Sequence, residues 1–487
     1  MNAAAKIDNG AFIARMLTSG GDKRICVATS ANTNMYGASP FPRSILGYAA
    51  STANDISLDA FDHLKIVTSA WPVNTTISGE FYANALEKLR VKIKQCYTLP
   101  TDTDIVFAPS GTDLEYVALA LAKIGSRKAV TNIILGADEV GSGCILSAQG
   151  KTFATETALR ENIIKGSAIT GLEDTHVIEV PVRDAVGEAR TSCAVADDID
   201  FYVATIVKQR RHALVHIVHG SKTGLILPRM SEIDRLIARH GAAITFVVDA
   251  CQARINAATI NDYLIRGVIV LLSGSKFMGG PPFSGFALVP PRFPRKKPLP
   301  TGLKIVFRRG EWPLNWSGAD IFDNSANPGL LLRLEAALFE LDRFSRLGQR
   351  ERTRVITHFR GAVSSFVRHL DADIITGSVE PSCPNDHLIE RFTLATINLS
   401  RLPHSPDFAT AQRWQRVLAA RGLRLGQPVK CVKLPSGAWA GTLRVSLSMP
   451  LMITFSNLTD DALTKRLDKD MARITNVLGA AASTIAA

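Results

Sequence analysis

The chain of 487 residues is long enough for two or three packed domains, and its 46% hydrophobic and 21% charged residues are ordinary for a globular protein. The formal net charge of +12 would suit a polyanionic partner, but the basic residues are scattered, and their one dense cluster, residues 291–298, is a short Pro-bounded stretch with no nucleic-acid-binding motif beside it. The seven cysteines are widely spaced and form no CxxC pair, which argues against a disulfide framework and a zinc site. No apolar run reaches the ~18 residues that a membrane span requires. We therefore expect a cytoplasmic protein without nucleic-acid or membrane partners.

Residues 1–70 are rich in Gly, Ser, Asn and Pro and contain two loop-like stretches, 31–43 and 48–57. We expect these residues to form an N-terminal arm that packs on the rest of the chain. Polar side chains of the arm are candidates for lining a second-substrate pocket, although an exposed loop explains each one singly: Asn32, Asn34, Tyr36, Arg43, Ser51 and Asn54.

From about residue 100 to 290, β-rich runs alternate with helix-like segments. The seven runs are 104–110, 129–137, 176–182, 213–220, 243–250, 267–274 and 284–290. Because these runs are almost continuously apolar, they predict an α/β fold with a mostly parallel seven-stranded sheet that is covered on both faces. We expect three units: the N-terminal arm (1–70), a large domain (71–310) and a smaller α+β C-terminal domain (311–487).

Small polar clusters follow several of these runs. They are SGT at 110–112, HGSKTG at 219–224, DACQ at 249–252 and SGSK at 273–276. In open α/β sheets the ligand lies outside the carboxyl ends of the strands. The clusters therefore predict one site at this edge of the sheet.

The order and spacing of SGT, DACQ and SGSK, with the lysine 27 residues after the aspartate, resemble those of fold-type I pyridoxal-phosphate (PLP) enzymes. The similarity is to the group of class V aminotransferases and cysteine desulfurases. It covers residues 75–340 well and the C-terminal part loosely. The resemblance implies PLP as the cofactor, an amino acid as the small-molecule substrate, and a homodimer with a shared active site.

The resemblance also implies roles for the residues that hold the reactive part of the cofactor. Lys276 would form the Schiff base and move the α-proton, and Asp249 would keep the pyridine nitrogen protonated. Gln252 and Ser221 would lie near the phenolic oxygen, Ser221 in place of the family's Asn. The alternatives are a surface lysine, an aspartate that only caps a helix, and a glutamine that faces solvent.

Other residues match the family's phosphate-binding and ring-stacking positions. Ser110, Gly111 and Thr112 open a helix whose N–H groups would bind the phosphate, although any serine before a helix also serves as a cap. Ser273 would be a further phosphate ligand, and Ser325, with Asn327, would reach the phosphate of the partner subunit. Two positions depart from the family: Val140 replaces the stacking ring, and Ser275 stands where desulfurases have His.

Arg444 lies in a strand-like segment, 441–448, that resembles the strand whose arginine binds the substrate α-carboxylate. A structural salt bridge explains it equally well, and Arg24 or Arg43 of the arm could bind the carboxylate instead. His219 is a second candidate for substrate binding, with a packed, hydrogen-bonded histidine as the alternative. Glu139 and Ser142 are either polar contacts to the substrate or residues of a surface turn.

Several reactions remain open. An aminotransferase-like transferase is the first expectation. The alternative is a β- or γ-elimination, replacement or carbon–carbon bond-forming enzyme of a biosynthetic pathway, including one with an S-adenosylmethionine-type substrate, and a non-catalytic relative is the third. A desulfurase is disfavoured, because no cysteine lies near residue 398, where its reactive loop would fall, and Cys383 and Cys431 are displaced from that position.

Overall fold

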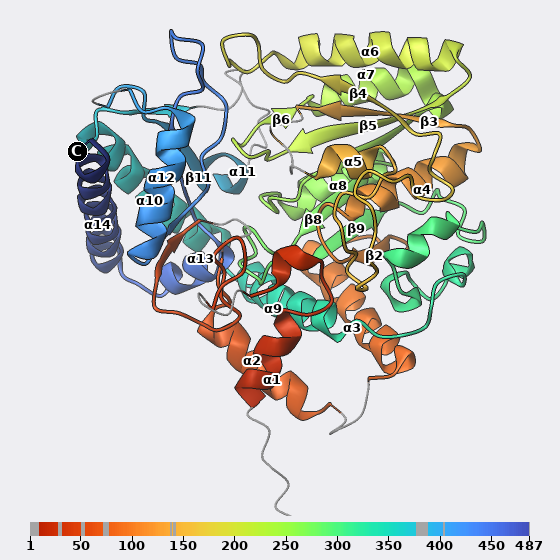
Figure 1. Ribbon diagram of the computed structural model, residues 1–487, viewed down its shortest axis with the longest axis horizontal. Coiled ribbons are helices and arrows are strands. Elements are labelled where there is room, and N and C mark those ends of the chain that lie inside the picture. The colour runs from red at the N-terminus through yellow and green to blue at the C-terminus, as the bar shows by residue number, and fades with distance from the viewer. Residues whose placement is uncertain are drawn as a thin grey trace, which may run out of the picture.

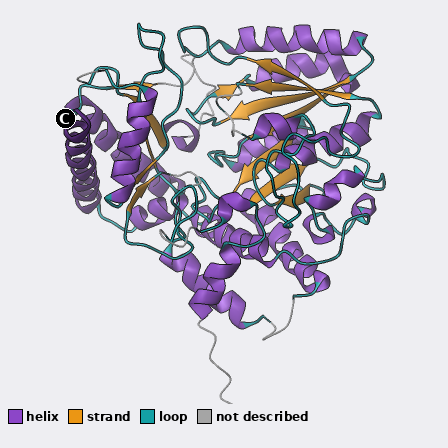
Figure 2. Ribbon diagram, viewed as in Figure 1, coloured by secondary structure: helices purple, strands orange, loops and turns teal. Residues whose placement is uncertain are grey.

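The computed structural model describes residues 9–27, 32–49, 54–71, 77–136, 139, 143–375, 388–402 and 405–486. The strands form one large sheet and two small ones, and helices surround them (Figures 1 and 2). Among the described helices, none combines the length and the hydrophobicity that crossing a bilayer would require.

The large sheet has the strand order β2-β9-β8-β7-β5-β3-β4, with the short β6 paired to β5. β9 is antiparallel to both of its neighbours, whereas β8, β7, β5, β3 and β4 run parallel to one another. The strands are β2 (Asp104–Ala108), β3 (Val130–Leu135), β4 (His176–Val180), β5 (His212–His219), β6 (Ile226–Leu227), β7 (Ile244–Asp249), β8 (Ile269–Ser273) and β9 (Gly285–Val289). The prediction of a mostly parallel seven-stranded sheet is confirmed, and β6 is a small addition to it.

Both faces of this sheet are covered by other elements. Successive side chains of a strand point to opposite sides, so each strand contributes side chains to both buried faces. Along β7, Val247 belongs to one buried hydrophobic cluster and Val248 to the other, and Leu271 and Leu272 of β8 divide in the same way. Helices that flank the sheet are α3 (Gly79–Tyr97), α4 (Leu114–Ser126), α5 (Cys144–Ala148), α6 (Ser192–Lys208), α7 (Met230–His240) and α8 (Ala257–Ile265). Burial on both faces explains why the strands are almost continuously apolar.

The C-terminal part is α+β, as expected. Its three-stranded antiparallel sheet has the order β10-β11-β13, formed by β10 (Asp373–Ile375), β11 (Leu394–Asn398) and β13 (Thr442–Ser446). The accompanying helices are α9 (Pro328–Ser345), α10 (Gln349–His369), α11 (Leu388–Phe392), α12 (Phe408–Ala420), α13 (Met449–Ser456) and α14 (Asp460–Ala486). α10 and α14 lie beside each other, at a distance from the large sheet (Figure 1). The domain boundaries themselves stay a prediction.

The N-terminal arm contacts both of the other parts. Its helices α1 (Asn9–Leu17) and α2 (Leu58–Ser69) pack on α9 (Figure 1). Between them, β1 (Leu46–Tyr48) pairs in parallel with β12 (Leu423–Leu425) of the C-terminal part. The arm is thus an integral part of the fold.

Candidate active site

Three of the predicted polar clusters meet at one edge of the large sheet. β7 and β8 are parallel, and β2 points the same way as β8 because both are antiparallel to β9. A methyl group added to Gly111 would lie 3.3 Å from the sulfur of Cys251, so the SGT and DACQ loops touch. The N–H of Phe277 donates to the carbonyl of Gln252 at 3.3 Å, which joins the SGSK turn to the DACQ loop.

Lys276 lies half-buried in the turn after β8, and distant segments hold that turn. The side-chain amide of Asn54 donates to the carbonyl of Lys276 at 3.0 Å. The N–H of Met449 donates to the carbonyl of Phe277 at 2.7 Å. Gly274 is needed for close packing, since an added methyl group would lie 2.4 Å from Cβ of Ala337. The position of Lys276 is therefore fixed by the arm, the large sheet and the C-terminal part together.

Asp249 ends β7 and lies close to the lysine turn. Its Oδ1 accepts a hydrogen bond from the N–H of Cys251 at 2.9 Å. Burial raises the pKa of the Cys251 thiol well above its usual value; the charge of Asp249 raises it further and the charge of Lys276 lowers it. The two charged groups thus act on the same buried thiol from neighbouring strands.

Beneath Asp249 lies a buried pair that the sequence analysis missed. His216 of β5 and Glu115 of α4 approach with 3.2 Å between Nδ1 and Oε2, and each side chain is 5% exposed. Burial raises the pKa of Glu115 well above its usual value, and the charge of Asp249 raises it further. Burial lowers the pKa of His216 to about 4. Burial thus disfavours the charged form of both groups. Polar residues inside the apolar runs EYVALALA and ALVHIV were the available signal.

The hydroxyl of Ser110 has a partner among the described residues, whereas two backbone N–H groups of the SGT loop do not. That hydroxyl donates to Oδ2 of Asp113 at 2.6 Å, and burial raises the pKa of Asp113 to about 7. Within the described part of the chain, no group accepts a hydrogen bond from the N–H of Gly111 or Thr112, which lie just before α4. These donors suit a phosphate, because the start of a helix attracts anions. Beside them, the hydroxyls of Ser273 and Ser275 lie 2.8 Å apart.

Ser221 and His219 have structural partners. The Ser221 hydroxyl donates to Oε2 of Glu139 at 2.8 Å, and Arg183 pairs with the same carboxylate through Nε at 2.8 Å. His219 is 3% exposed; its Nδ1 lies 3.2 Å from the Tyr263 hydroxyl and its Nε2 lies 3.5 Å from Glu390. These contacts favour the packed alternative for His219. They leave the cofactor contact of Ser221 a prediction.

Other candidates are less well defined by the geometry. Ser325 donates to Oδ2 of Asp323 at 3.0 Å, and its proposed contact with a partner subunit stays a prediction. Asn327 caps α9, because its Oδ1 accepts from the N–H of Leu330 at 3.1 Å. Four positions considered in the sequence lie outside the described residues: Ser51, Val140, Ser142 and Cys383.

Arg444 differs from the other two candidate arginines, because no described carboxylate pairs with it. Arg24 is paired with Asp22, with 2.6 Å between Nη2 and Oδ2, and Arg43 is paired with Asp55 at 2.7 Å. Arg444 instead donates from Nε to the carbonyl of Gln427 at 2.6 Å and from Nη1 to that of Lys222 at 3.0 Å.

No ion pair of Arg444 with a carboxylate is found among the described residues, and none of them accepts a hydrogen bond from its Nη2. Arg444 is only 6% exposed, and burial lowers its pKa to about 10. The salt-bridge alternative therefore has no partner in the described part of the chain. A substrate carboxylate would supply the missing charge.

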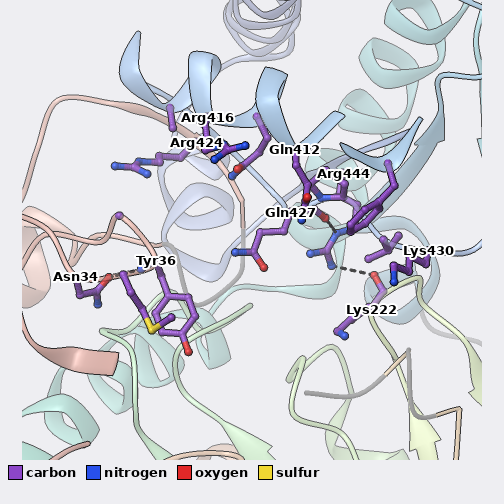
Figure 3. Close-up of a pocket in the computed structure, with 16 residues that line it drawn as sticks. Asn34, Tyr36, Lys222, Gln412, Arg416, Arg424, Gln427, Lys430 and Arg444 are labelled. Carbon is purple, nitrogen blue, oxygen red and sulfur yellow. Dashed lines mark hydrogen bonds between the residues drawn. The ribbon is translucent and has the colours of Figure 1, made fainter. Parts of the chain in front are cut away.

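Arg444 lines a cavity of about 670 Å³ between the arm, the turn after β5 and the C-terminal part (Figure 3). Asn34 and Tyr36 line it from the arm, and Lys222 lines it from the turn. Burial lowers the pKa of Lys222, and the charges of Arg444 and Lys276 lower it further. The charge of Lys222 therefore interacts both with Arg444 in the cavity and with Lys276 in the turn after β8.

The architecture is similar to that of two solved proteins. A NifS-like protein aligns with a TM-score of 0.52 and 16% identity over 88% of this chain and 99% of its own. The ureidoglycine–glyoxylate aminotransferase of Bacillus subtilis aligns with a TM-score of 0.51 and 11% identity over 92% of this chain and 99% of its own. The predicted fold is confirmed. No protein-family model matches the sequence, and no curated protein matches it significantly. At these identities the likeness concerns the fold, and the chemistry must be argued from the site.

Proposed function

We propose that the protein is a PLP-dependent enzyme that acts on an amino acid, with aminotransferase-like transfer as its reaction. The observation that carries the proposal is the approach of Lys276 and Asp249 at the carboxyl ends of neighbouring strands, with both charges acting on Cys251. The fold that the chain shares with an aminotransferase supports it. The two N–H donors of Gly111 and Thr112 provide a place for the phosphate.

The residues present fit the cofactor at each of its ends. The amine of Lys276 would bind its aldehyde, the carboxylate of Asp249 its ring nitrogen, and the SGT loop its phosphate. When bound, PLP withdraws electrons from the α-carbon of the substrate. Asp249 would hold a proton at the ring nitrogen, helped by the hydrogen bond from Cys251. Lys276 would move the proton at the α-carbon, and Arg444 would bind the α-carboxylate.

Reductive labelling tests this assignment. The purified protein is incubated with PLP, reduced with borohydride and digested, and mass spectrometry locates the modified lysine. We expect the label on Lys276 and none on the Lys276→Ala variant. Lys222→Ala is the matched control, because Lys222 is a second half-buried lysine near the site, and this variant should keep the label. Label on Lys222, or undiminished label in Lys276→Ala, would refute the assignment.

The size of the cavity keeps one alternative open. About 670 Å³ is within the range of pockets that bind molecules larger than a small amino acid. A bulky substrate would suit an elimination, a replacement or a carbon–carbon bond-forming lyase. Product analysis separates the reactions, because transamination releases a keto acid whereas elimination releases a leaving group.

Cysteine desulfurization remains disfavoured for a structural reason. Cys431 is completely buried, and burial raises the pKa of its thiol to about 12. A reactive cysteine needs an accessible thiolate near neutral pH. We also keep a homodimer with a shared active site in the proposal, on the strength of the resemblance. Sedimentation equilibrium of the purified protein tests it.

A further inference from the structure

The charged residues described as lining the cavity beside Arg444 are all positive. Five of its lining side chains are cationic: Lys222, Arg416, Arg424, Lys430 and Arg444. None of its lining residues is Asp or Glu, although the chain contains 44 acidic residues. Arg444 is buried, Lys222 and Arg424 are half-buried, and Arg416 and Lys430 are exposed. Removing three like charges from water around one cavity is costly unless an anion neutralises them.

The cations form two groups on opposite sides of the cavity. Figure 3 shows Arg416 and Arg424 on one side, Arg444 with Lys222 on the other, and Gln427 between them. Arg416 belongs to α12, and Arg424 belongs to β12, which contacts α12. Under the proposed function, Arg444 binds the α-carboxylate. That role leaves the charge of Arg416 and Arg424 unexplained.

Arg424 forms no ion pair with a carboxylate among the residues that the structure describes. Within the described residues, its Nε is buried without a hydrogen-bond partner. The nearby carboxylate of Asp55 is taken by Arg43, which binds it from Nε and Nη2, each at 2.7 Å. Burial lowers the pKa of Arg424, the charge of Arg43 lowers it further, and the charge of Asp55 raises it. The charge of one carboxylate is thus shared by two arginines.

The arm leaves room for this guanidinium. A methyl group added to Gly37 would lie 2.2 Å from Nη1 of Arg424, and Gly37 has a φ of +74°. Glycine, which has no Cβ, therefore occupies the position where the arm passes the guanidinium of Arg424. Asn34 of the same turn faces the cavity from this side (Figure 3). The arm and the α12–β12 segment together build the distal end of the cavity.

We propose that the substrate is an amino acid whose side chain ends in a second anionic group, a phosphate or a carboxylate, and that Arg424 and Arg416 bind this group. The inference rests on the proposed function, because it takes Arg444 as the ligand of the α-carboxylate. The planar guanidinium of arginine suits either oxyanion through paired hydrogen bonds. The volume of the cavity is sufficient for such an extended molecule.

Calorimetric titration of the PLP-loaded protein with matched probes tests the inference. O-phospho-L-serine and L-glutamate carry the second anion, whereas L-glutamine and L-alanine do not. We expect at least one anionic probe to bind about tenfold or more tightly than the neutral ones, as the gain of a charge-assisted pair implies. The relative affinities of O-phospho-L-serine and L-glutamate distinguish a phosphate from a carboxylate. Equal affinities for all four probes would overturn the proposal without any variant being needed.

Variants then locate the distal group. Arg424→Gln and Arg416→Gln should each weaken the anionic probes about tenfold or more and leave the neutral probes unchanged. Arg413→Gln is the matched control, because Arg413 is an exposed residue of the same helix that does not line the cavity. Equal losses in Arg413→Gln and Arg424→Gln would also overturn the proposal.

Failure of this inference is separable from failure of the proposed function. If borohydride labels Lys276 but the anionic probes show no preference, only the distal site is wrong. If Lys276 is not labelled, the titration is repeated on the cofactor-free protein. If the cofactor-free protein still prefers the anionic probes, and the preference depends on Arg424, the result supports an anion-binding cavity. If that preference is absent, both the distal site and the proposed function are overturned.

Discussion

Replacing His216 by asparagine should remove an acid-sensitive contribution to the free energy of unfolding. His216 lies beneath Asp249, with its Nδ1 3.2 Å from Glu115, and it is 4% exposed. Asparagine keeps a polar group near that position but does not titrate. The variant therefore tests whether the histidine is buried in its neutral form.

The magnitude follows from the pKa of His216, which burial lowers from 6.5 to about 4. Between these two pH values the unfolded chain binds a proton that the native protein does not. The native state therefore loses stability as the pH falls from 6.5 to 4, by about 3 kcal/mol at most. Most of this loss, about 2–3 kcal/mol, should develop between pH 7.5 and 4.5.

Urea unfolding followed by tryptophan fluorescence measures the effect at several pH values. The quantity to compare is the difference in unfolding free energy between the wild type and His216→Asn, because it cancels titrating groups that lie away from His216. Glu115 does not cancel, since it contacts His216, and it acts with the opposite sign: its raised pKa gives stability at low pH that is lost as the pH rises. His176→Asn, at an exposed histidine, is the control. A difference that stays constant from pH 7.5 to 4.5 would show that His216 is not held neutral by burial.

Two further predictions concern the surroundings of the site. Asn327→Ala removes the cap of α9 and should lower the free energy of unfolding by about 1–2 kcal/mol, seen as a lower urea midpoint; an unchanged midpoint would mean that the cap contributes nothing. Gly274→Ala places a methyl group 2.4 Å from Cβ of Ala337 and should displace the lysine turn, so that labelling by PLP and borohydride falls while the far-ultraviolet circular dichroism stays native. Full labelling of that variant would contradict the close packing inferred for the turn.

The large sheet could be predicted because its strands carry their own signal. The run from Ile244 to Asp249 is apolar until its last residue, and burial on both faces requires that pattern. The edge at which Asp249 and Lys276 meet follows from the rule for the carboxyl ends of parallel strands. The three-residue strand β1 carries no comparable signal, since its pairing with β12 joins segments that are far apart in the chain.

The partners of the candidate side chains could not be predicted in the same way. The sequence does not show that Ser221 donates to Glu139, or that His219 lies between Tyr263 and Glu390, because these contacts depend on how separate elements pack. Which arginine is left to bind a substrate carboxylate could be predicted in part, since Asp22 is only two residues from Arg24 and forms an ion pair with it. The absence of a carboxylate beside Arg444 is visible only in three dimensions.

The hydrogen bonds that hold the lysine turn also set the order in which the site can form during translation. Asn54 and Gln252 precede Lys276 in the chain and are synthesised before it. Met449 follows Lys276 by about 170 residues. At the usual speed of synthesis that interval is on the order of 10–30 s. A nascent chain that already contains every strand of the large sheet still lacks one of the hydrogen bonds that hold the turn of Lys276. This turn is therefore completed near the end of translation, well after the strands that precede it.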